Sequence, residues 1–358
     1  GGVLMKDFDE HRIHRRIMQT AFKSDVIKSY VPKINQIVHE TVASWAQKDH
    51  ILLFDEIKLL LLKIAFQVFC YTDSNKTDIN TINNAFIDMM EGSVSYIRKD
   101  WPGLNFHKGM NGRRYLYTFF RQMVAEKRAG HGDDIMSYFC KETKENGEYF
   151  SDHEIAEHMI FLLLAAHDTS SSTSTMAGYY LASHPQWQKN LKTEMEALQK
   201  AAPDYNDIFS GMPQAKLVHD EVLRLHPPVG TIYRRTVNEC MIDGYTVPAD
   251  TMLICPVQYN HRLERYWQNP DSFIPERFAS KNPEHKAHPF LWTPFGGGAH
   301  KCIGMHFAEL LFKTLFGELM HYYTLEFAKP NYYPAKLQYF PFAKPVDNLP
   351  VRLKSLAH

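Results

Sequence analysis

The chain has 358 residues, of which 44% are hydrophobic and 22% are charged, so it can bury a large core. Lysine plus arginine equals aspartate plus glutamate at 40 each, and this balance argues against a nucleic-acid binder. The five cysteines are odd in number and widely scattered, which predicts reduced thiols and hence an intracellular protein rather than a disulfide framework.

Apolar residues recur at helical spacing through most of the first 225 residues. The predicted helices cover residues 9–22, 26–45, 52–69, 79–96, 113–129, 151–183, 185–200 and 214–225. Ser151 and Glu154 form a capping box that opens the longest of these helices. The most apolar run, 51–71, contains four charged residues and therefore predicts a core helix rather than a membrane span. No signal peptide is visible.

The pattern changes after Pro227 and Pro228, where short strand-like segments begin. The predicted strands cover residues 231–236, 240–247 and 251–255, with turns at 243–244 and 248–250. Segment 266–300 is rich in Pro, Gly, Asn and His, which predicts mostly loop. A last helix follows Cys302, and the tail is strand-like at 338–342 and 351–354. We therefore expect a mainly α fold with a minor β component.

A glycine-rich segment, FGGGAHKCIG at residues 295–304, places one cysteine before a predicted helix. A cysteine binds metal as a thiolate, which the partial positive charge of a helix N-terminus favours. The glycines allow positive φ and close approach of a flat partner to the backbone. An ordinary buried cysteine is the commoner explanation of one such residue. A zinc site with His300, Cys302 and His306 is excluded because no further Cys pair or spaced His pair accompanies it.

The whole segment resembles the haem-binding loop of the cytochromes P-450, whose pattern is Phe-x-x-Gly-x-Arg/His-x-Cys-x-Gly. Every defined position is present: Phe295, Gly298, His300, Cys302 and Gly304. The resemblance implies that Cys302 is the metal ligand of haem b, iron protoporphyrin IX, and that Phe295, His300 and Gly304 contact this cofactor. It also implies one catalytic domain over residues 1–358 that lacks the N-terminal part of the family fold. The protein would then be cytoplasmic unless a membrane anchor precedes Gly1.

A polar cluster, HDTSSST at residues 167–173, lies in the apolar middle of the longest predicted helix. Ser, Thr and Asp are weak helix formers, so we expect the helix to be weakened or widened there. A solvent-exposed polar face would also explain the cluster. It resembles the family's oxygen-activating helix, which implies that Thr169 hydrogen-bonds dioxygen or its water and that Asp168 relays protons. Ala165 would then lie against the porphyrin, and Ala166 replaces a glycine common in the family.

Glu221 and Arg224 are three residues apart, so they share one face of a predicted helix and can form an ion pair. Such pairs are frequent on helix surfaces and carry little information alone. With their apolar neighbours they resemble the family's Glu-x-x-Arg helix. The PERF segment at 275–278 resembles the partner whose arginine, here Arg277, joins the network. The implied role is structural support of the cysteine loop.

Haem carries two propionates, which need cationic partners. The basic helix near the start of the chain resembles the family's helix with a His and an Arg one turn apart, which selects His11 and Arg15. Arg234 matches the family's strand arginine in preference to Arg235, and His300 is a third candidate. A solvated cationic face for a redox partner is the other explanation of the basic helix.

The motifs follow the family's order along nearly the whole chain, which implies a haem-thiolate monooxygenase. One atom of O2 enters a lipophilic substrate, with electrons drawn ultimately from NAD(P)H through a separate ferredoxin or flavoprotein reductase. Two other classes stay open, a non-catalytic thiolate-haem sensor or carrier and a haem-free helical scaffold. The candidate pocket residues are Phe161, Leu162, Val229, Thr231, Ile232, Tyr339 and Phe340. The serine and threonine run after Asp168 resembles the sterol-demethylating branch of the family, which implies a sterol or related terpenoid, and short fatty acids, retinoids and xenobiotics stay open.

Overall fold

The computed structural model describes residues 2–70, 78–130, 132–200, 202–279, 281 and 283–356. The chain forms two compact units. Unit 1 comprises Gly1–Thr41 and Lys58–Asp168, and unit 2 comprises Val42–Ile57 and Thr169–His358. Three helices, α2, α3 and α7, contribute residues to both units. The candidate site residues are therefore distributed over two separately packed cores.

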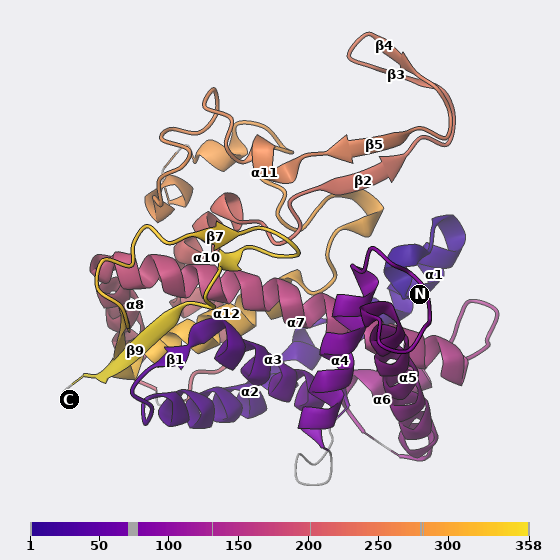
Figure 1. The fold of residues 1–358 in the computed structure, drawn as a ribbon, viewed down its shortest axis with the longest axis horizontal. Helices are drawn as coiled ribbons and strands as arrows, with labels where there is room; N and C mark the ends of the chain where they lie inside the picture. The colour runs from indigo at the N-terminus through magenta and orange to yellow at the C-terminus, as the bar shows by residue number, and fades with distance from the viewer. Residues whose placement is uncertain are drawn as a thin grey trace. The chain divides into compact units, whose positions relative to one another are not determined.

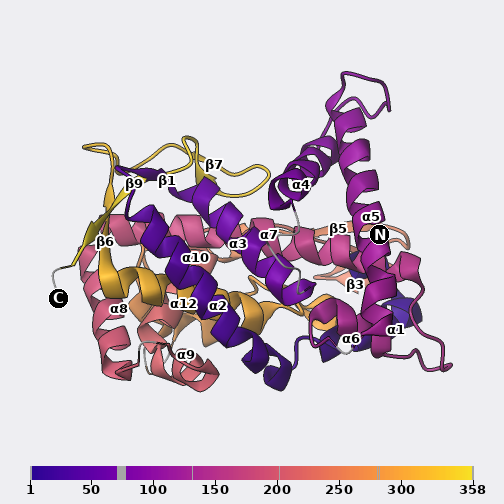
Figure 2. The same ribbon diagram turned by 90° about the horizontal axis from the view of Figure 1, so that it is seen from below.

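Unit 1 is helical in its described residues. Its elements are η1 (Val3–Met5), α1 (Phe8–Thr20), α2 (Ser24–Trp45), α3 (Leu53–Phe69), α4 (Ile79–Ser93), α5 (Asn105–Ala129), α6 (Ile135–Lys141) and the first half of α7 (Asp152–Ser183). Helices α4 and α5 lie side by side (Figures 1 and 2). A Cβ at Gly109 would lie 2.7 Å from the Cα of Gly92, so glycine permits this close approach.

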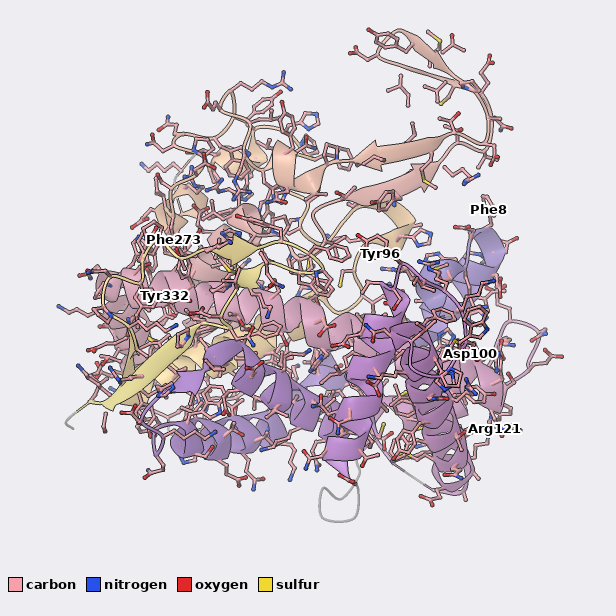
Figure 3. The ribbon with its side chains drawn as sticks, in the orientation of Figure 1. Phe8, Tyr96, Asp100, Arg121, Phe273 and Tyr332 are labelled. Carbon is pink, nitrogen blue, oxygen red and sulfur yellow. The ribbon has the colours of Figure 1, made fainter. Side chains whose placement is uncertain are left out.

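The connection between α4 and α5 contains Asp100 and the exposed Tyr96, both labelled in Figure 3, and Asp100 holds the connection to α5. Arg114 donates from Nη2 to Asp100 Oδ2 at 3.1 Å, and His107 Nδ1 lies 2.6 Å from Asp100 Oδ1. Both partners lie on α5. These contacts are partly solvent-exposed, so they fix the path of the connection more than they stabilise the fold.

Helix α3 forms where the sequence predicts a core helix. Its apolar residues Ile57, Leu60 and Ile64 are buried at helical spacing, whereas Lys63 is exposed. Such an amphipathic pattern belongs to a helix that packs against protein on one side. Among the helices that the structure describes, none has the length and apolar character required to cross a membrane.

Helix α7 opens with the predicted capping box. The Glu154 N–H donates to Ser151 Oγ at 3.2 Å, and the Ser151 N–H donates to Glu154 Oε2 at 2.8 Å. The expected weakening at residues 167–173 is wrong, because α7 is a continuous α-helix through this cluster. Hydroxyls there bond back to the preceding turn, as Thr173 Oγ1 does to the Thr169 carbonyl at 3.0 Å. The backbone therefore keeps its own hydrogen bonds.

Unit 2 combines the second half of α7 with further helices and all of the described strands. Its helices are α8 (Pro185–Leu198), α9 (Tyr205–Gly211), α10 (Pro213–Leu225), α11 (Val257–Asn260), η2 (Pro275–Phe278), η3 (Glu284–Lys286), η4 (Gly298–His300) and α12 (Met305–Tyr322). Helix α12 packs on α8 and α10 and buries Leu310, Phe316 and Leu319. This packing fixes the helix that follows the cysteine loop.

The strands of unit 2 form four small antiparallel sheets. The strands are β1 (Ile51–Leu52), β2 (Ile232–Arg235), β3 (Cys240–Ile242), β4 (Tyr245–Val247), β5 (Met252–Cys255), β6 (Tyr323–Phe327), β7 (Leu337–Gln338), β8 (Lys344–Pro345) and β9 (Pro350–Ser355). The pairings are β1-β9-β6, β2-β5, β3-β4 and β7-β8. Figure 2 shows β1, β9 and β6 together, and Figure 1 shows β3–β4 beyond the β2–β5 pair. In β2, Arg234 pairs with Leu253 of β5.

The sequence missed several elements of this mainly α architecture, among them α6, α9 and β6. Helices α6 and α9 have seven residues each, which is too short for a clear apolar period. Strand β6 follows α12 without a turn, so no breaker residue marks it. Helix α5 begins at Asn105, whereas the sequence predicted a start at residue 113. The prediction missed the first turns because they contain polar residues and two buried glycines, which obscure the apolar period. Of the predicted strand at 338–342, only Gln338 lies in a strand, at the end of β7, and β8 begins at Lys344, beyond the predicted range.

Candidate functional site

The cysteine loop of unit 2 is tightly bent. The Gly296 N–H donates to the Thr293 carbonyl at 3.0 Å, and the Cys302 N–H donates to the Phe295 carbonyl at 2.9 Å. Gly296 and Gly298 have φ of 71° and 70°, the left-handed region that glycine tolerates best. A Cβ at Gly298 would meet no atom within 4 Å, so the backbone there faces open space.

Cys302 is the best placed of the five free cysteines to bind a metal. Its side chain is exposed, and it lies shortly before Gly304, the N-cap of α12. Cys70 and Cys140 are buried, and burial raises the pKa of the Cys140 thiol to about 11. Burial also raises the pKa of Cys70 far above its usual value. These two thiols therefore resist the thiolate form that a metal requires.

Arg234 joins the cysteine loop to β2. Its Nη2 donates to the Gly297 carbonyl at 3.2 Å, and its Nη1 donates to the Tyr233 carbonyl at 2.8 Å. Carbonyl partners leave the guanidinium charge unneutralised. Arg235, by contrast, forms an exposed ion pair with Asp250 at 2.6 Å between Nη1 and Oδ1. The geometry thus supports the choice of Arg234 over its neighbour as a partner for an anionic group near the loop.

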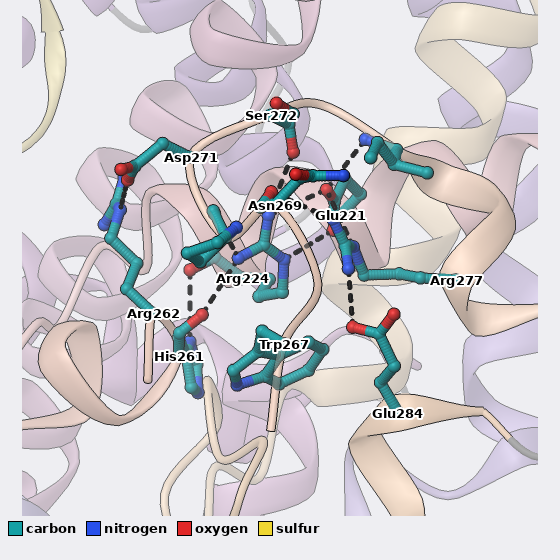
Figure 4. Close-up of polar contacts among 12 residues, drawn as sticks. Glu221, Arg224, His261, Arg262, Trp267, Asn269, Asp271, Ser272, Arg277 and Glu284 are labelled. Carbon is teal, nitrogen blue, oxygen red and sulfur yellow. Dashed lines mark hydrogen bonds and ion pairs between the residues drawn. The ribbon is translucent and has the colours of Figure 1, made fainter. Parts of the chain in front are cut away.

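The structure brings Glu221, Arg224 and Arg277 together in one buried network (Figure 4). Arg224 is bidentate to Glu221, with Nε 2.7 Å from Oε2 and Nη2 2.9 Å from Oε1. Arg277 Nε lies 3.2 Å from the same Glu221 Oε1, and its Nη1 lies 2.5 Å from Glu284 Oε2. The sequence predicted the first three members. It gave no signal for Glu284, which lies seven residues beyond Arg277 at the start of the three-residue helix η3.

The same network includes carbonyl groups and a histidine that the sequence did not mark. Arg224 Nη1 donates to the carbonyls of His261 and Pro270 at 2.9 and 2.6 Å. The buried His261 ring accepts the Thr293 N–H at Nε2, 3.0 Å away, and its Nδ1 lies 3.3 Å from the Arg224 carbonyl. Burial lowers the pKa of His261 to about 4, so the ring is neutral. It links Arg224 directly to the start of the cysteine loop.

In unit 1, helix α1 carries the two residues predicted to face propionates. His11 is buried and Arg15 half-buried, whereas Arg12 is exposed and forms an ion pair with Glu145 at 3.1 Å between Nη1 and Oε1. The buried His14 Nδ1 lies 2.7 Å from His158 Nε2 of α7. Burial lowers the pKa of His14 to about 4, so both rings can be neutral partners. The sequence missed this pair, which fixes α1 on α7.

Asp168 of α7 is buried beside two partners in unit 1. Its Oδ1 lies 3.0 Å from His167 Nδ1 and 3.5 Å from Lys58 Nζ of α3. Burial raises the pKa of Asp168, but the His167 hydrogen bond and the Lys58 charge together lower it more, leaving it below the usual value. Asp168 was predicted, but Lys58 was not, because no pattern relates it to residues 110 positions away.

The remaining predicted site residues differ in how far they are exposed to solvent. Leu162 is buried in unit 1, and Phe161 and Ala165 are half-buried. In unit 2, the half-buried residues are Thr169, Thr231, Ile232, Phe295, His300 and Gly304, and the exposed ones are Val229, Tyr339 and Phe340. The Tyr339 ring stacks on His226, with centroids 6.0 Å apart. The apolar members with exposed surface are available to a lipophilic ligand.

The donor set fits haem b. The cysteine loop offers one exposed thiol, that of Cys302, which suits a metal whose remaining ligands come largely from a macrocycle. The open space at Gly298 suits a flat partner, and the unneutralised guanidinium of Arg234 suits a propionate. The residues present in unit 2 thus match the cofactor that the loop motif implies.

Comparison with known proteins decides the family. The family model described as cytochrome P450 matches residues 1–345. The chain belongs to the cytochrome P450 family. It is 37% identical over 358 residues to a Mycobacterium tuberculosis protein named cytochrome P450 136, covering 99% of this chain and 72% of that protein. It is 29% identical to cytochrome P450 716A75 of Maesa lanceolata, covering 95% and 71%.

The fold agrees with that family. A cyanobacterial P450 solved with retinoic acid bound, CYP120A1, superposes with a TM-score of 0.91 at 24% identity, covering 99% of this chain and 81% of that one. The predicted class is confirmed: the chain is a cytochrome P450 monooxygenase with a mainly α fold. The family uses haem b, O2 and lipophilic substrates, with electrons from NAD(P)H through a partner.

Proposed function

We propose that Cys302 would supply the thiolate ligand of the haem and that Asp168 and Thr169 deliver protons for the oxidation of an isoprenoid lipid, a sterol or other terpenoid. The observation that carries the ligand assignment is the accessible Cys302 thiol in the bent loop before α12. Amides of such a loop can orient a thiolate and moderate its electron donation. Arg234, His11, Arg15 and His300 are the proposed cations for the propionates.

Haem, when bound, supplies the centre at which O2 is reduced and one oxygen atom is inserted into a C–H bond. The overall reaction consumes two electrons and two protons for each O2, and the second oxygen atom leaves as water. Protons must therefore enter a site from which bulk water is largely excluded. Asp168 is suited to receive them because it is buried, and Thr169 follows it directly in α7 with a hydroxyl that both donates and accepts.

Glu221, Arg224 and Arg277 support the loop rather than react. His261 connects their network to Thr293, two residues before Phe295. Because Glu221, Arg224 and Arg277 are buried, we expect this connection to restrict movement of the loop. Ala165 would place only a methyl group against the porphyrin, where a larger side chain would take space from it. These roles need no movement of the residues during turnover.

The isoprenoid proposal rests on chemistry and on one neighbour. The candidate pocket residues are mostly apolar or aromatic, which favours a ligand with few polar groups. Retinoic acid, the ligand of CYP120A1, is itself built from isoprene units. Binding is tested by titrating the ferric protein with retinoic acid, a sterol and a saturated fatty acid of similar length. A spin-state change with the fatty acid alone would reject the isoprenoid class.

The ligand assignment is tested by the reduced, carbon monoxide-bound spectrum. Wild-type protein should show the red-shifted Soret band of thiolate haem, and Cys302→Ala should lose it. Cys255→Ala is a matched control, since this thiol is also exposed but lies on β5. Retention of the band in Cys302→Ala contradicts the assignment.

The redox partner is proposed to be a separate ferredoxin or flavoprotein reductase. Reconstitution with each partner type and NAD(P)H should give oxidised product with at least one of them. Thr169→Ala should then release peroxide and consume NAD(P)H without product. Thr175→Ala is the control, because its buried hydroxyl donates to the Ser171 carbonyl at 2.7 Å in the same helix. Unchanged coupling in Thr169→Ala would reject the proton-delivery role.

A further inference from the structure

His167 has two hydrogen-bond partners that both accept. Its Nε2 lies 2.9 Å from the Lys58 carbonyl oxygen, and its Nδ1 lies 3.0 Å from Asp168 Oδ1. A carbonyl oxygen can only accept, so Nε2 must carry a proton. A neutral imidazole has one N–H, and with that proton on Nε2 its Nδ1 would direct a lone pair at a carboxylate oxygen. One more proton is required between the ring and Asp168.

The charges around the pair decide where that proton lies. Lys58 Nζ is 3.5 Å from the same oxygen, Asp168 Oδ1, and its positive charge favours the carboxylate. The Phe86 ring of α4 meets the His167 ring edge to face, with centroids 5.0 Å apart. The His167 side chain is fully buried, so its charge is acceptable only because both N–H groups have partners.

We propose that His167 is a doubly protonated positioning residue that shares a transferable proton with Asp168. The inference rests on the proposed relay role of Asp168 and adds His167 as the residue that supplies the proton to its carboxylate. On delivery, the proton leaves Nδ1 of His167 for Oδ1 of Asp168, which passes it toward Thr169. The ring keeps its Nε2 proton and is neutral until solvent restores the Nδ1 proton.

Lys58 provides the solvent side of this arrangement. Its side chain is 21% exposed, whereas that of Asp168 is 8% exposed. The ammonium group therefore contacts both water and the buried carboxylate, so a proton can reach Asp168 Oδ1 along a path that does not open the core. The two elements that hold the proton, α3 and α7, both belong to unit 1 at these residues.

A second His–Asp dipeptide gives an internal contrast. His219 and Asp220 of α10 are also consecutive and buried, but His219 Nδ1 lies 3.5 Å from Asp220 Oδ1. Asp220 instead contacts Lys216 Nζ at 2.7 Å. The dipeptide alone therefore does not create a shared proton. At His167 the ring also faces a second acceptor, the Lys58 carbonyl oxygen, which holds one proton on Nε2. The hydrogen bond to Asp168 therefore needs a second, shared proton.

The test is nitrogen NMR of the reduced, carbon monoxide-bound holoprotein labelled with ring-¹⁵N histidine. His167→Gln assigns the signals by their loss, and His261→Gln does the same for a ring expected to be neutral. We expect both His167 nitrogens to be protonated at neutral pH and His261 to be protonated only at Nδ1. A neutral His167 ring in the wild-type protein overturns the proposal.

Asp168→Asn tests the cause of the second proton. An asparagine amide can donate to Nδ1, so His167 should lose its second proton and become the neutral Nε2–H form. An unchanged doubly protonated ring overturns the sharing with Asp168. This readout does not depend on turnover. If the ring is doubly protonated but Asp168→Asn remains fully coupled, the relay role of Asp168 fails, whereas the protonation state stands.

Discussion

His167 and His261 are both fully or almost fully buried, yet their partners demand different charges. His261 receives an N–H from Thr293 and faces one carbonyl, so a single ring proton satisfies it. His167 faces a carbonyl and a carboxylate, so it needs two. Burial alone would predict two neutral rings. We infer from this contrast that hydrogen-bond partners decide the charge of a buried histidine, and we propose that one cluster supports the loop while the other stores a proton.

The largest effect is expected on the His261 side. Glu221→Gln removes one charge from a fully buried pair and leaves Arg224 and Arg277 without a full counter-charge. It should lower the free energy of unfolding by about 3–5 kcal/mol and reduce haem content. Urea unfolding and haem-to-protein ratio measure this. Glu276→Gln, at an exposed position beside Arg277, is the control and should be near wild type.

The next effect concerns the His167 side. Asp168→Asn removes the group that passes protons on, so product formed per NAD(P)H consumed should fall by about 10²-fold with the Soret band intact. Asp220→Asn is the matched control, because it lies after a histidine and beside a lysine but outside the proposed relay. Comparable uncoupling in both variants would mean that the two clusters do not differ in function.

The next effect is a loss of stability at acid pH that we attribute to His261. The pKa of His261 is lowered to about 4 in the folded protein, below the ordinary value of 6.5. Between these values the unfolded chain binds more protons, so the free energy of unfolding should fall by about 1–3 kcal/mol from pH 6.5 to pH 4. Denaturation midpoints across this range measure it. His261→Gln should flatten the profile.

The smallest effect is expected from Lys58→Met. Losing the Lys58 charge removes one of the causes that hold the pKa of Asp168 low, so the carboxyl should stay protonated to higher pH. The pH optimum of coupled turnover should move upward, with a change in rate at neutral pH of about two- to fivefold. Lys63→Met, on an exposed position of the same helix, is the control. An unchanged optimum would separate Lys58 from the relay.

The family, the cofactor class and the long helices could be predicted from the amino-acid sequence. The loop motif at 295–304, the Glu-x-x-Arg helix and the acid–threonine pair are local patterns, so each is readable from consecutive residues. Long helices were also predictable, because an amphipathic period repeats within them. Short elements such as α6 and strand β6 carried too few residues to show a period.

The pairing of the charged and polar groups became visible in the three-dimensional structure alone. Lys58 and His167 are more than 100 residues apart, and so are Arg12 and Glu145. No sequence spacing reports such contacts, because they arise from the packing of separate helices. Glu284 and His261 entered the Glu221 network in the same way. The sequence predicted Asp168 as an acid. The carbonyl of Lys58 contacts His167 and its ammonium group contacts Asp168, and both groups lie on another helix. The proposed protonation of the pair depends on these contacts, which no local pattern reports.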